Sequence, residues 1–197
     1  MDESQLESYI SKAENANTHH SKAYHFSNFV RDVLCEKIDI ELTKETLPEL
    51  EEYLINEKGT ITVQSKTVDP PRNSIIEFKT SKLSPWGNKE IIEKAKEQLR
   101  SYIFILWRKQ GAELQYLLIA SDGLRNFVYK PSLKGDLESI TERKEDKIGK
   151  DLDRQLKEII KLEKINDIDI SKADTNQVQD WLDHYLIGVE KSPNSQD

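Results

Sequence analysis

Apolar residues recur along this chain at two spacings, and each spacing predicts a different element. In the first clear segment they lie three and four apart, on one face of an amphipathic helix: Phe26, Phe29, Val30, Val33 and Leu34. Residues 60–64 alternate and are rich in β-branched side chains, so they predict a strand. Residues 74–80 predict a second strand, which begins with apolar residues on both faces and is therefore expected to be central in a sheet.

The second half of the chain predicts one long helix and several shorter elements. The long helix covers residues 88–107, with Asn88 as its N-cap. Its buried stripe consists of Ile91, Ala95, Leu99, Tyr102, Ile103 and Leu106. The elements expected after it are a buried strand at 114–120, a strand at 126–129 that closes a hairpin before Pro131, and helices near 152–162 and 175–187.

The order of these elements predicts the fold class. Helix, strand, strand, helix, strand, strand and helices are typical of an α/β sandwich, in which a central mixed sheet is flanked by helices, here with extra C-terminal helices. We divide the chain into a polar N-terminal segment, a core, a helical extension and a disordered tail, at residues 1–20, 21–135, 136–190 and 191–197.

The composition says more about the cellular setting of this protein than about its activity. Hydrophobic residues make up 36% of the chain and charged residues 33%, with a net charge of −7. No apolar run approaches the roughly 20 residues that span a bilayer. The first residues are acidic and polar, and the single Cys35 cannot form an internal disulfide. We therefore expect a cytoplasmic protein with no membrane contact; nucleic acid is not excluded, because one local basic patch is enough to bind it.

Glu77 and Lys79 lie two apart on the predicted central strand, so their side chains project from one face. A carboxylate there is a hard oxygen ligand for Mg²⁺, and an ammonium group can orient water or stabilise charge during phosphodiester hydrolysis. For an isolated E-x-K, an ordinary ion pair is the commoner interpretation. Two features favour a catalytic role for the pair. It follows an apolar stretch, and the next helix carries Gln98 and Tyr102 four residues apart on one face.

The segments IIEFKT and EKAKEQLRSYIFIL resemble the core of the PD-(D/E)XK nuclease superfamily, in particular its RecB-like branch. In that branch, E-x-K on a strand is followed by a helix with Q-x-x-x-Y. KGTITV resembles the preceding strand, and LLIASDGLRNFVYKP resembles the hairpin after the nuclease core in the amino-terminal portions of some restriction-modification proteins. The resemblance covers residues 20–131; the E-x-K and Q-x-x-x-Y combination is moderately specific, and the other matches are weak.

The resemblance implies a restriction-endonuclease-like α/β sandwich and a Mg²⁺-dependent DNA endonuclease, with Mn²⁺ as a substitute, in restriction-modification or phage defence. It implies that Glu77 is a metal ligand and Lys79 the catalytic lysine, and that Gln98 and Tyr102 line the site. Glu36 is the nearest candidate for an early-helix carboxylate that completes such sites. The implied partners are DNA, a methyltransferase or helicase subunit or domain, and a second copy of the chain.

One expected residue of the family is missing. The metal-binding aspartate should lie on the strand before Glu77, and Thr62 occupies the most natural position for it. A neutral hydroxyl is a much poorer Mg²⁺ ligand than a carboxylate. Three alternatives stay open: Asp69, in VDPP, supplies the carboxylate from the loop; Glu57 supplies it from the start of the strand; or the site is degenerate and the chain binds without cutting.

Positive charge near the proposed site predicts contacts with nucleic acid. The candidates are the basic residues Lys82, Lys94 and Arg100. Trp86 is a further candidate, because its ring could stack on a base. A hydrophobic plug over the core is an equally good interpretation of Trp86. Three functions therefore remain: a metal-dependent DNA endonuclease, which the motifs favour; a degenerate nuclease-like module that binds nucleic acid or a partner protein; and an interaction domain in which the Glu–Lys pair is only structural.

Overall fold

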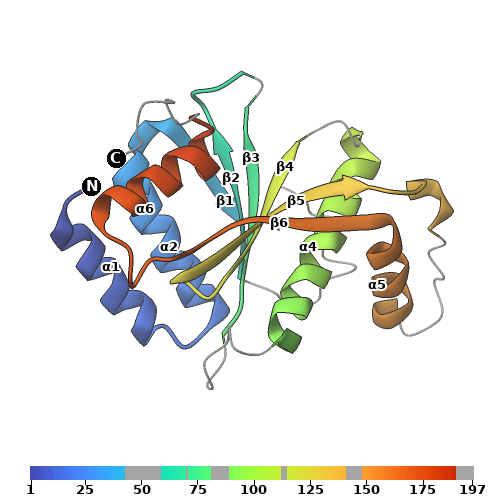
Figure 1. The fold of residues 1–197 in the computed structure, drawn as a ribbon, viewed down its shortest axis with the longest axis horizontal. Coiled ribbons are helices and arrows are strands. Elements are labelled where there is room, and N and C mark those ends of the chain that lie inside the picture. The colour runs from blue at the N-terminus through green and yellow to red at the C-terminus, as the bar shows by residue number, and fades with distance from the viewer. Residues whose placement is uncertain (43–58, 70, 81–88, 112–114, 141–147, 190–197) are drawn as a thin grey trace.

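The computed structural model describes residues 1–42, 59–69, 71–80, 89–111, 115–140 and 148–189, which form a sheet between two layers of helices (Figure 1). The sheet has six strands, which neighbour one another in chain order. They are β1 (Ile38–Leu42), β2 (Thr60–Ser65), β3 (Asn73–Phe78), β4 (Tyr116–Ser121), β5 (Arg125–Leu133) and β6 (Ile160–Asp169). Neighbours are antiparallel except β3 and β4, which are parallel and joined through the helix α4 (Lys89–Gln110). The predicted α/β class, with a mixed sheet flanked by helices, is confirmed.

Helices lie on both sides of this sheet (Figure 1). On one side are α1 (Glu3–Asn15), α2 (His19–Leu34) and α6 (Thr175–Leu182), which continues into the π-helical turn η5 (Asp183–Ile187). On the other side are α4 and α5 (Ile148–Ile159), and two short 3-10 helices, η1 (Cys35–Lys37) and η4 (Leu137–Ser139), complete the described elements. None of the described helices is both long enough and apolar enough to cross a bilayer.

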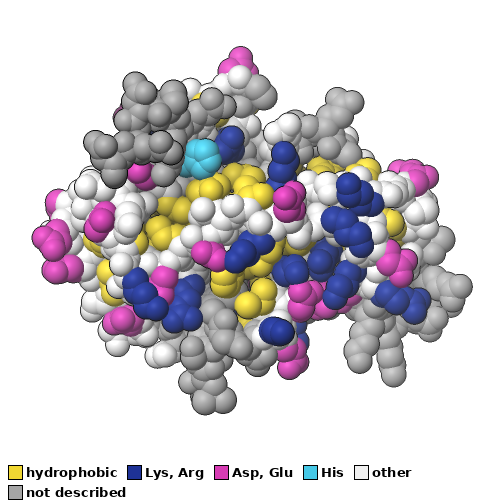
Figure 2. Space-filling view, in the orientation of Figure 1, with side chains coloured by type: hydrophobic (Ala, Val, Ile, Leu, Met, Phe, Trp, Pro, Cys, Tyr) yellow, Lys and Arg dark blue, Asp and Glu magenta, His cyan; other side chains and the backbone are white. Residues whose placement is uncertain are grey.

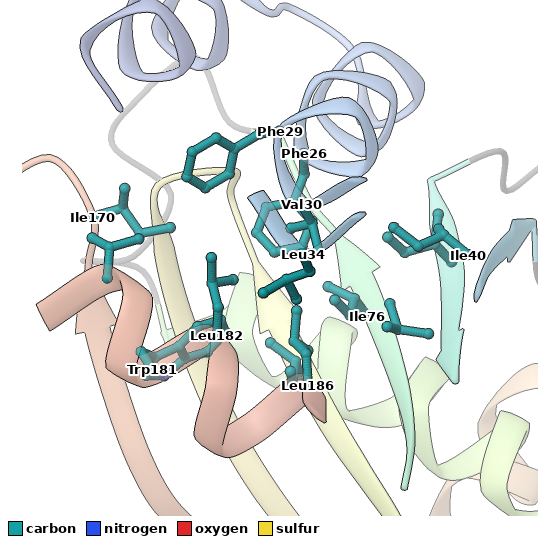
Figure 3. Close-up of a cluster of buried hydrophobic side chains, with 14 of the residues drawn as sticks. Phe26, Phe29, Val30, Leu34, Ile40, Ile76, Ile170, Trp181, Leu182 and Leu186 are labelled. Carbon is teal, nitrogen blue, oxygen red and sulfur yellow. The ribbon is translucent and has the colours of Figure 1, made fainter. Parts of the chain in front are cut away.

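The apolar stripe predicted on α2 packs against the sheet and forms the first of two cores (Figure 3). Phe26, Val30 and Leu34 are fully buried there, together with Ile76 of β3 and Leu182 of α6. Burial of such side chains is the main source of stability for this half of the molecule.

The second core lies between the sheet and the helices α4 and α5. Ile75 of β3 contributes to it with Leu99 and Ile103 of α4 and Leu156 of α5, all fully buried. Because successive strand residues point to opposite faces, Ile75 and Ile76 serve the two cores separately. The expectation that this strand is central is confirmed.

Two parts of the chain expected outside the core belong to it. Within residues 1–20, α1 buries Leu6 and Tyr9 against the first core. Residues 136–190 are not purely helical as predicted, because they contain β6, which pairs with β5 along its length. β6 is an edge strand with exposed charged residues such as Lys161 and Glu163, so its pattern resembles that of a solvated surface. The predicted tail, residues 191–197, lies outside the described residues.

Two strand predictions need correction. β1 was not predicted, although Ile38 and Ile40 alternate with polar residues along it and are buried. β5 does not stop before Pro131 but continues to Leu133. Pro131 lies beyond Tyr129, the last residue of β5 that pairs with β4, and its partner on the other side is Leu162 of β6.

Candidate functional site at the carboxyl end of β3

The predicted Glu–Lys pair lies at the carboxyl ends of the two parallel strands. Glu77 is the second-last residue of β3, and its neighbours across the sheet are Thr60 of β2 and Ala120 of β4. The backbone N–H of Lys79 donates to the carbonyl of Ser121 at 2.8 Å, so the chain stays alongside β4 beyond the strand end. In open α/β sheets, ligands bind outside the carboxyl ends of parallel strands. The pair therefore lies where a site is expected.

Helix α4 places Gln98 and Tyr102 against the same face of the sheet. The two residues are four apart and so lie one turn apart on the helix. Apolar residues between and beside them, including Ala95, Leu99 and Ile103, are buried in the second core and fix the helix to the sheet. Tyr102 is buried and Gln98 is partly buried. The helical periodicity read from the sequence thus brings both polar groups over the end of β3.

Five polar side chains form one connected row, which we call the polar row: Gln98, Lys79, Glu77, Thr60 and Tyr102. Lys79 Nζ donates to Gln98 Oε1 and lies 2.9 Å from Glu77 Oε1. Thr60 Oγ1 donates to the other carboxylate oxygen, Glu77 Oε2. The hydroxyl oxygens of Thr60 and Tyr102 are 2.8 Å apart. Because the polar row begins and ends on α4, it ties β2 and β3 to that helix.

The number of available protons fixes the direction of these hydrogen bonds. A threonine hydroxyl has one proton, and Thr60 donates it to Glu77. In the contact between Thr60 and Tyr102, the tyrosine must therefore be the donor. Glu77 accordingly accepts a hydrogen bond from a neutral group on one oxygen and faces an ammonium on the other.

The two charges of the polar row are deeply buried. Glu77 is 0% exposed and Lys79 is 7% exposed. Burying either charge alone would be strongly unfavourable, whereas together they carry no net charge and each faces its counter-ion. The polar row is therefore a neutral unit, and removing one charged partner would leave the other unpaired in the protein interior.

The described residues do not fit a Mg²⁺ ion at this position. Mg²⁺ requires an octahedral set of oxygen ligands and is usually held by one or two carboxylates with water. Here the two oxygens of Glu77 face Thr60 and Lys79, so a cation would have to displace an ammonium group. Across the described part of the chain, no group of three or more His, Cys, Asp or Glu side chains is placed to hold a metal ion.

The expectation that Asp69 completes a metal site with Glu77 is contradicted by the strand register. β2 and β3 are antiparallel, with Thr60 opposite Glu77 and Gln64 opposite Asn73. The turn that contains Asp69 connects the far end of this hairpin. The two ends are four residue steps apart along the strand, which is about 14 Å at the usual rise per strand residue. Asp69 is also exposed, and it cannot share an ion with Glu77 in this fold.

Glu36 also lies too far from Glu77 to bind the same metal ion. It lies in η1, directly before β1, and the first residue of β1 pairs with Ser65 at the end of β2. This is again the end of the sheet opposite to Glu77. Glu36 is exposed, so its predicted role as a metal ligand beside Glu77 is wrong in this structure.

Thr60, and not Thr62, is the residue that faces Glu77. Thr62 lies on the same face of β2 but is opposite Ile75, two residue pairs farther along the hairpin. The alternation of side chains along the two strands shows that Thr60 or Thr62 can face Glu77. Which of the two does so depends on the strand register, which the connecting turn sets and the sequence pattern does not reveal. Three other residues considered from the sequence lie outside the described residues: Glu57, Lys82 and Trp86.

Of the two described candidates for nucleic-acid contacts, Lys94 is exposed and Arg100 is buried. Lys94 is exposed on α4 and forms an ion pair with Glu90 at 3.1 Å. Arg100 is 5% exposed, and its Nε donates to the carbonyl of Ile160 at 3.2 Å. Arg100 therefore joins α4 to the start of β6, and its predicted contact with nucleic acid is wrong in this structure.

Comparison of the chain with protein-family models, curated proteins and solved structures gives no match. The relation to the PD-(D/E)XK nucleases remains a prediction from the sequence motifs. The structure adds that the four residues named by those motifs, Glu77, Lys79, Gln98 and Tyr102, belong to one row of contacts.

Proposed function

We propose that this chain is a nuclease-like domain of restriction-endonuclease-like fold that binds DNA without cutting it. The hydrogen bond from Thr60 to Glu77 is the observation that carries this proposal. It fills, with a neutral hydroxyl, the place where a second carboxylate would have to face the first one to hold a divalent cation. The setting implied by the sequence resemblance is cytoplasmic restriction-modification or phage defence.

The nuclease relationship is supported by contacts between separately identified residues. Glu77 and Lys79 were identified by spacing on a strand, and Gln98 and Tyr102 by spacing on a later helix. An accidental E-x-K gives no reason for these two pairs to meet, yet Lys79 donates to Gln98, and Thr60 links Glu77 to Tyr102. Because one fold serves many functions, the site chemistry has to decide between cutting and binding.

The accessibility of the two charged groups argues against cutting. A nucleophilic water and a phosphodiester would both have to reach Glu77 and Lys79, which are almost completely buried. The ammonium of Lys79 is already engaged by Gln98 and Glu77. In this arrangement the polar row holds β2, β3 and α4 together and presents no reacting group to a substrate.

DNA binding is supported by a basic surface elsewhere on the molecule. Figure 2 shows Lys and Arg side chains gathered around the region of β6 and α5. The exposed lysines of β5, α5, β6 and the segment after β5, a set that we call the basic face, are Lys130, Lys134, Lys157, Lys161 and Lys164. Exposed acidic residues lie on the same elements, among them Glu158, Glu163 and Asp167. Lys157 and Lys164 form ion pairs with Glu93 and Asp167, whereas the other three have no ion pair with another described residue. Lys161 Nζ donates to the backbone carbonyl of Lys157 at 3.0 Å. Lysines that are not held in ion pairs can neutralise phosphates.

A matched pair of variants tests this proposal. The double substitution Lys134→Glu and Lys161→Glu reverses two charges on the basic face, whereas Lys12→Glu and Lys37→Glu, at exposed sites of α1 and η1, make the same change in net charge. We expect duplex DNA binding, measured by fluorescence anisotropy over a series of salt concentrations, to be weakened far more by the first pair. The slope of log K against log salt should also fall by about 2.

Two results would redirect this proposal. Absence of binding to duplex and single-stranded DNA at low salt, by a folded chain, would favour the interaction domain that has no role in nucleic acid. Equal weakening by the two double substitutions would mean that net charge, and not the basic face, determines binding.

A metal-dependent DNA endonuclease is the second candidate, and the meeting of Glu77 and Lys79 with Gln98 and Tyr102 favours it. It requires another carboxylate near Glu77, for which Glu57, outside the described residues, is the candidate from the sequence. Incubation with plasmid and single-stranded DNA in Mg²⁺ or Mn²⁺ separates the candidates. Cleavage that is abolished by Lys79→Ala in a folded variant would establish the endonuclease; we expect no cleavage by either chain.

A further inference from the structure

We propose that a cleft on the α4 side of the sheet binds a small organic cation, one that carries a guanidinium group on a short carbon chain. The cleft has a volume of about 230 Å³. It lies at the amino ends of the parallel strands β3 and β4, whose first residues, Asn73 and Tyr116, line it. This is the end of the sheet opposite to the polar row. Binding at the cleft is separate from DNA binding, so each can be present without the other.

The strand register aligns polar side chains along the floor of the cleft. Asp39, Gln64, Asn73 and Tyr116 are direct neighbours across β1, β2, β3 and β4. Asn73 is two residues from Ile75 and therefore shares the face that packs against α4. Directly paired residues project from the same face, so all four side chains do. Hydrogen-bonding groups from four strands thus converge on one place.

The charge of the cleft favours a cation. Among the described residues that line it, none is basic, whereas Asp39 and Glu41 are acidic. Asp39 forms a half-exposed ion pair with Lys66 at 2.7 Å, but Glu41 has no ion pair or hydrogen bond with another described residue. The C-terminal end of α4 borders the cleft and carries partial negative charge, and the basic residues of its last turn, Arg108 and Lys109, do not line the cleft.

The other lining groups favour a guanidinium group among the organic cations. Its five N–H donors lie in one plane and can meet a carboxylate and further oxygens at the same time. Glu41 offers the carboxylate, and the side-chain amide oxygens of Gln64 and Asn73 accept no hydrogen bond from another described residue. Leu106 and Tyr116 are buried beside these groups and offer apolar contact to a short carbon chain.

Propylguanidinium and propylurea are matched probes, because propylurea has the same shape with an uncharged head group. Nuclear magnetic resonance titration of the ¹⁵N-labelled chain follows the side-chain amide signals of Gln64 and Asn73. We expect propylguanidinium to shift these signals saturably, with a Kd of about 10 mM or tighter for so small a molecule. Propylurea should bind at least about tenfold more weakly, because it cannot form charge-assisted hydrogen bonds.

Two further probes identify the source of the guanidinium group. Agmatine is a free molecule, whereas acetyl-Gly-Arg-Gly-amide presents the same group on a peptide. Tighter binding of agmatine would identify a small metabolite as the ligand. Tighter binding of the peptide would identify an arginine side chain of a partner protein. Either result supports the guanidinium site.

Glu41→Gln and Glu36→Gln are the matched variants of the chain. Each neutralises one exposed carboxylate, and only Glu41 lines the cleft. We expect Glu41→Gln to weaken the binding of propylguanidinium about tenfold and Glu36→Gln to change it less than about twofold, with both variants folded by circular dichroism. The proposal is overturned if the signals of the wild type do not saturate, if propylurea binds as tightly as propylguanidinium, or if the two variants weaken binding equally.

Discussion

The two faces of the central sheet bury different kinds of side chain. Toward α1, α2 and α6, β3 buries Ile76 and Phe78, whereas toward α4 it buries Ile75 and Glu77, with Lys79 just beyond. Apolar burial contributes about 25 cal/mol per Å². A buried ion pair contributes little net stability, because desolvation offsets the attraction between its partners. Apolar burial therefore accounts for the stability of the first face, whereas the polar row on the second face adds specific contacts between β2, β3 and α4 and little net stability.

The largest expected effect comes from breaking the apolar face. Phe78 is fully buried, and its ring lies 5.5 Å from that of Phe26. Phe78→Ala should lower the free energy of unfolding by about 3 to 5 kcal/mol, because it removes the ring and leaves a cavity. Urea unfolding followed by circular dichroism measures this value. A loss below about 1 kcal/mol would mean that the first core is not packed as described.

The second expected effect comes from unpairing the charges of the polar row. Lys79→Met keeps the length of the side chain but leaves the carboxylate of Glu77 buried without its counter-ion. We expect a loss of about 3 kcal/mol in the same urea experiment. Combining Lys79→Met with Glu77→Gln removes both charges and should recover most of that loss. If the double variant is as unstable as the single one, packing of Lys79 matters and its charge does not.

A smaller effect should follow when one neutral link of the polar row is removed. Tyr102→Phe takes away the hydrogen bond that Tyr102 donates to Thr60, at a cost of about 1 to 2 kcal/mol. In a chain that already carries Thr60→Val, the same substitution should cost clearly less, since the acceptor is gone. A double-mutant cycle measures this coupling. A coupling of zero would mean that the hydrogen bond between Thr60 and Tyr102 does not contribute to stability.

The smallest effect concerns Asp122, a buried carboxyl in the turn between β4 and β5. Burial raises its pKa, and the hydrogen bonds from the N–H groups of Arg125 and Leu124 offset this only in part. A group whose pKa is higher in the folded state than in the unfolded state adds stability below the unfolded pKa and loses it as pH rises through the folded pKa. Asp122→Asn should therefore be more stable than the wild type at pH 8, where the carboxylate of Asp122 is ionised at a buried position.

The same pair of chains at lower pH provides the control for the Asp122 prediction. The difference in free energy of unfolding between Asp122→Asn and the wild type should shrink as pH falls through the folded pKa of Asp122 toward its ordinary pKa of 3.8, below which the carboxyl is mostly neutral in both states. A difference that stays constant between pH 4 and pH 8 would mean that the amide changes packing and not ionisation.

Short-range periodicity was enough to predict most of the polar row. Glu77 and Lys79 follow from the two-residue period of a strand, and Gln98 and Tyr102 from the four-residue spacing of a helix, because both periods are fixed by backbone geometry. Their meeting could only be expected from the family resemblance. Thr60 was missed because it depends on the register of a hairpin, which the turn and the cores set together.

The wrong predictions share a physical cause, which is the neglect of long-range packing. Asp69 is close to Glu77 in sequence, but an antiparallel hairpin puts its turn at the far end from the site. Arg100 has the spacing of an exposed helix residue, yet it is covered because β6 and α5 come back from far along the chain to pack on α4. β6 itself was missed because an edge strand shows many polar residues.

The central claim is that the hydrogen bonds and the ion pair of the polar row leave no place for a metal ion. Calorimetric titration of the wild-type chain with Mg²⁺ and Mn²⁺ tests this claim most directly. We predict no saturable binding at neutral pH, with the folded state confirmed by circular dichroism, and no difference between the wild type and Glu77→Gln. Saturable binding of one ion in the wild type that disappears in Glu77→Gln would contradict the claim and place a metal at the end of β3.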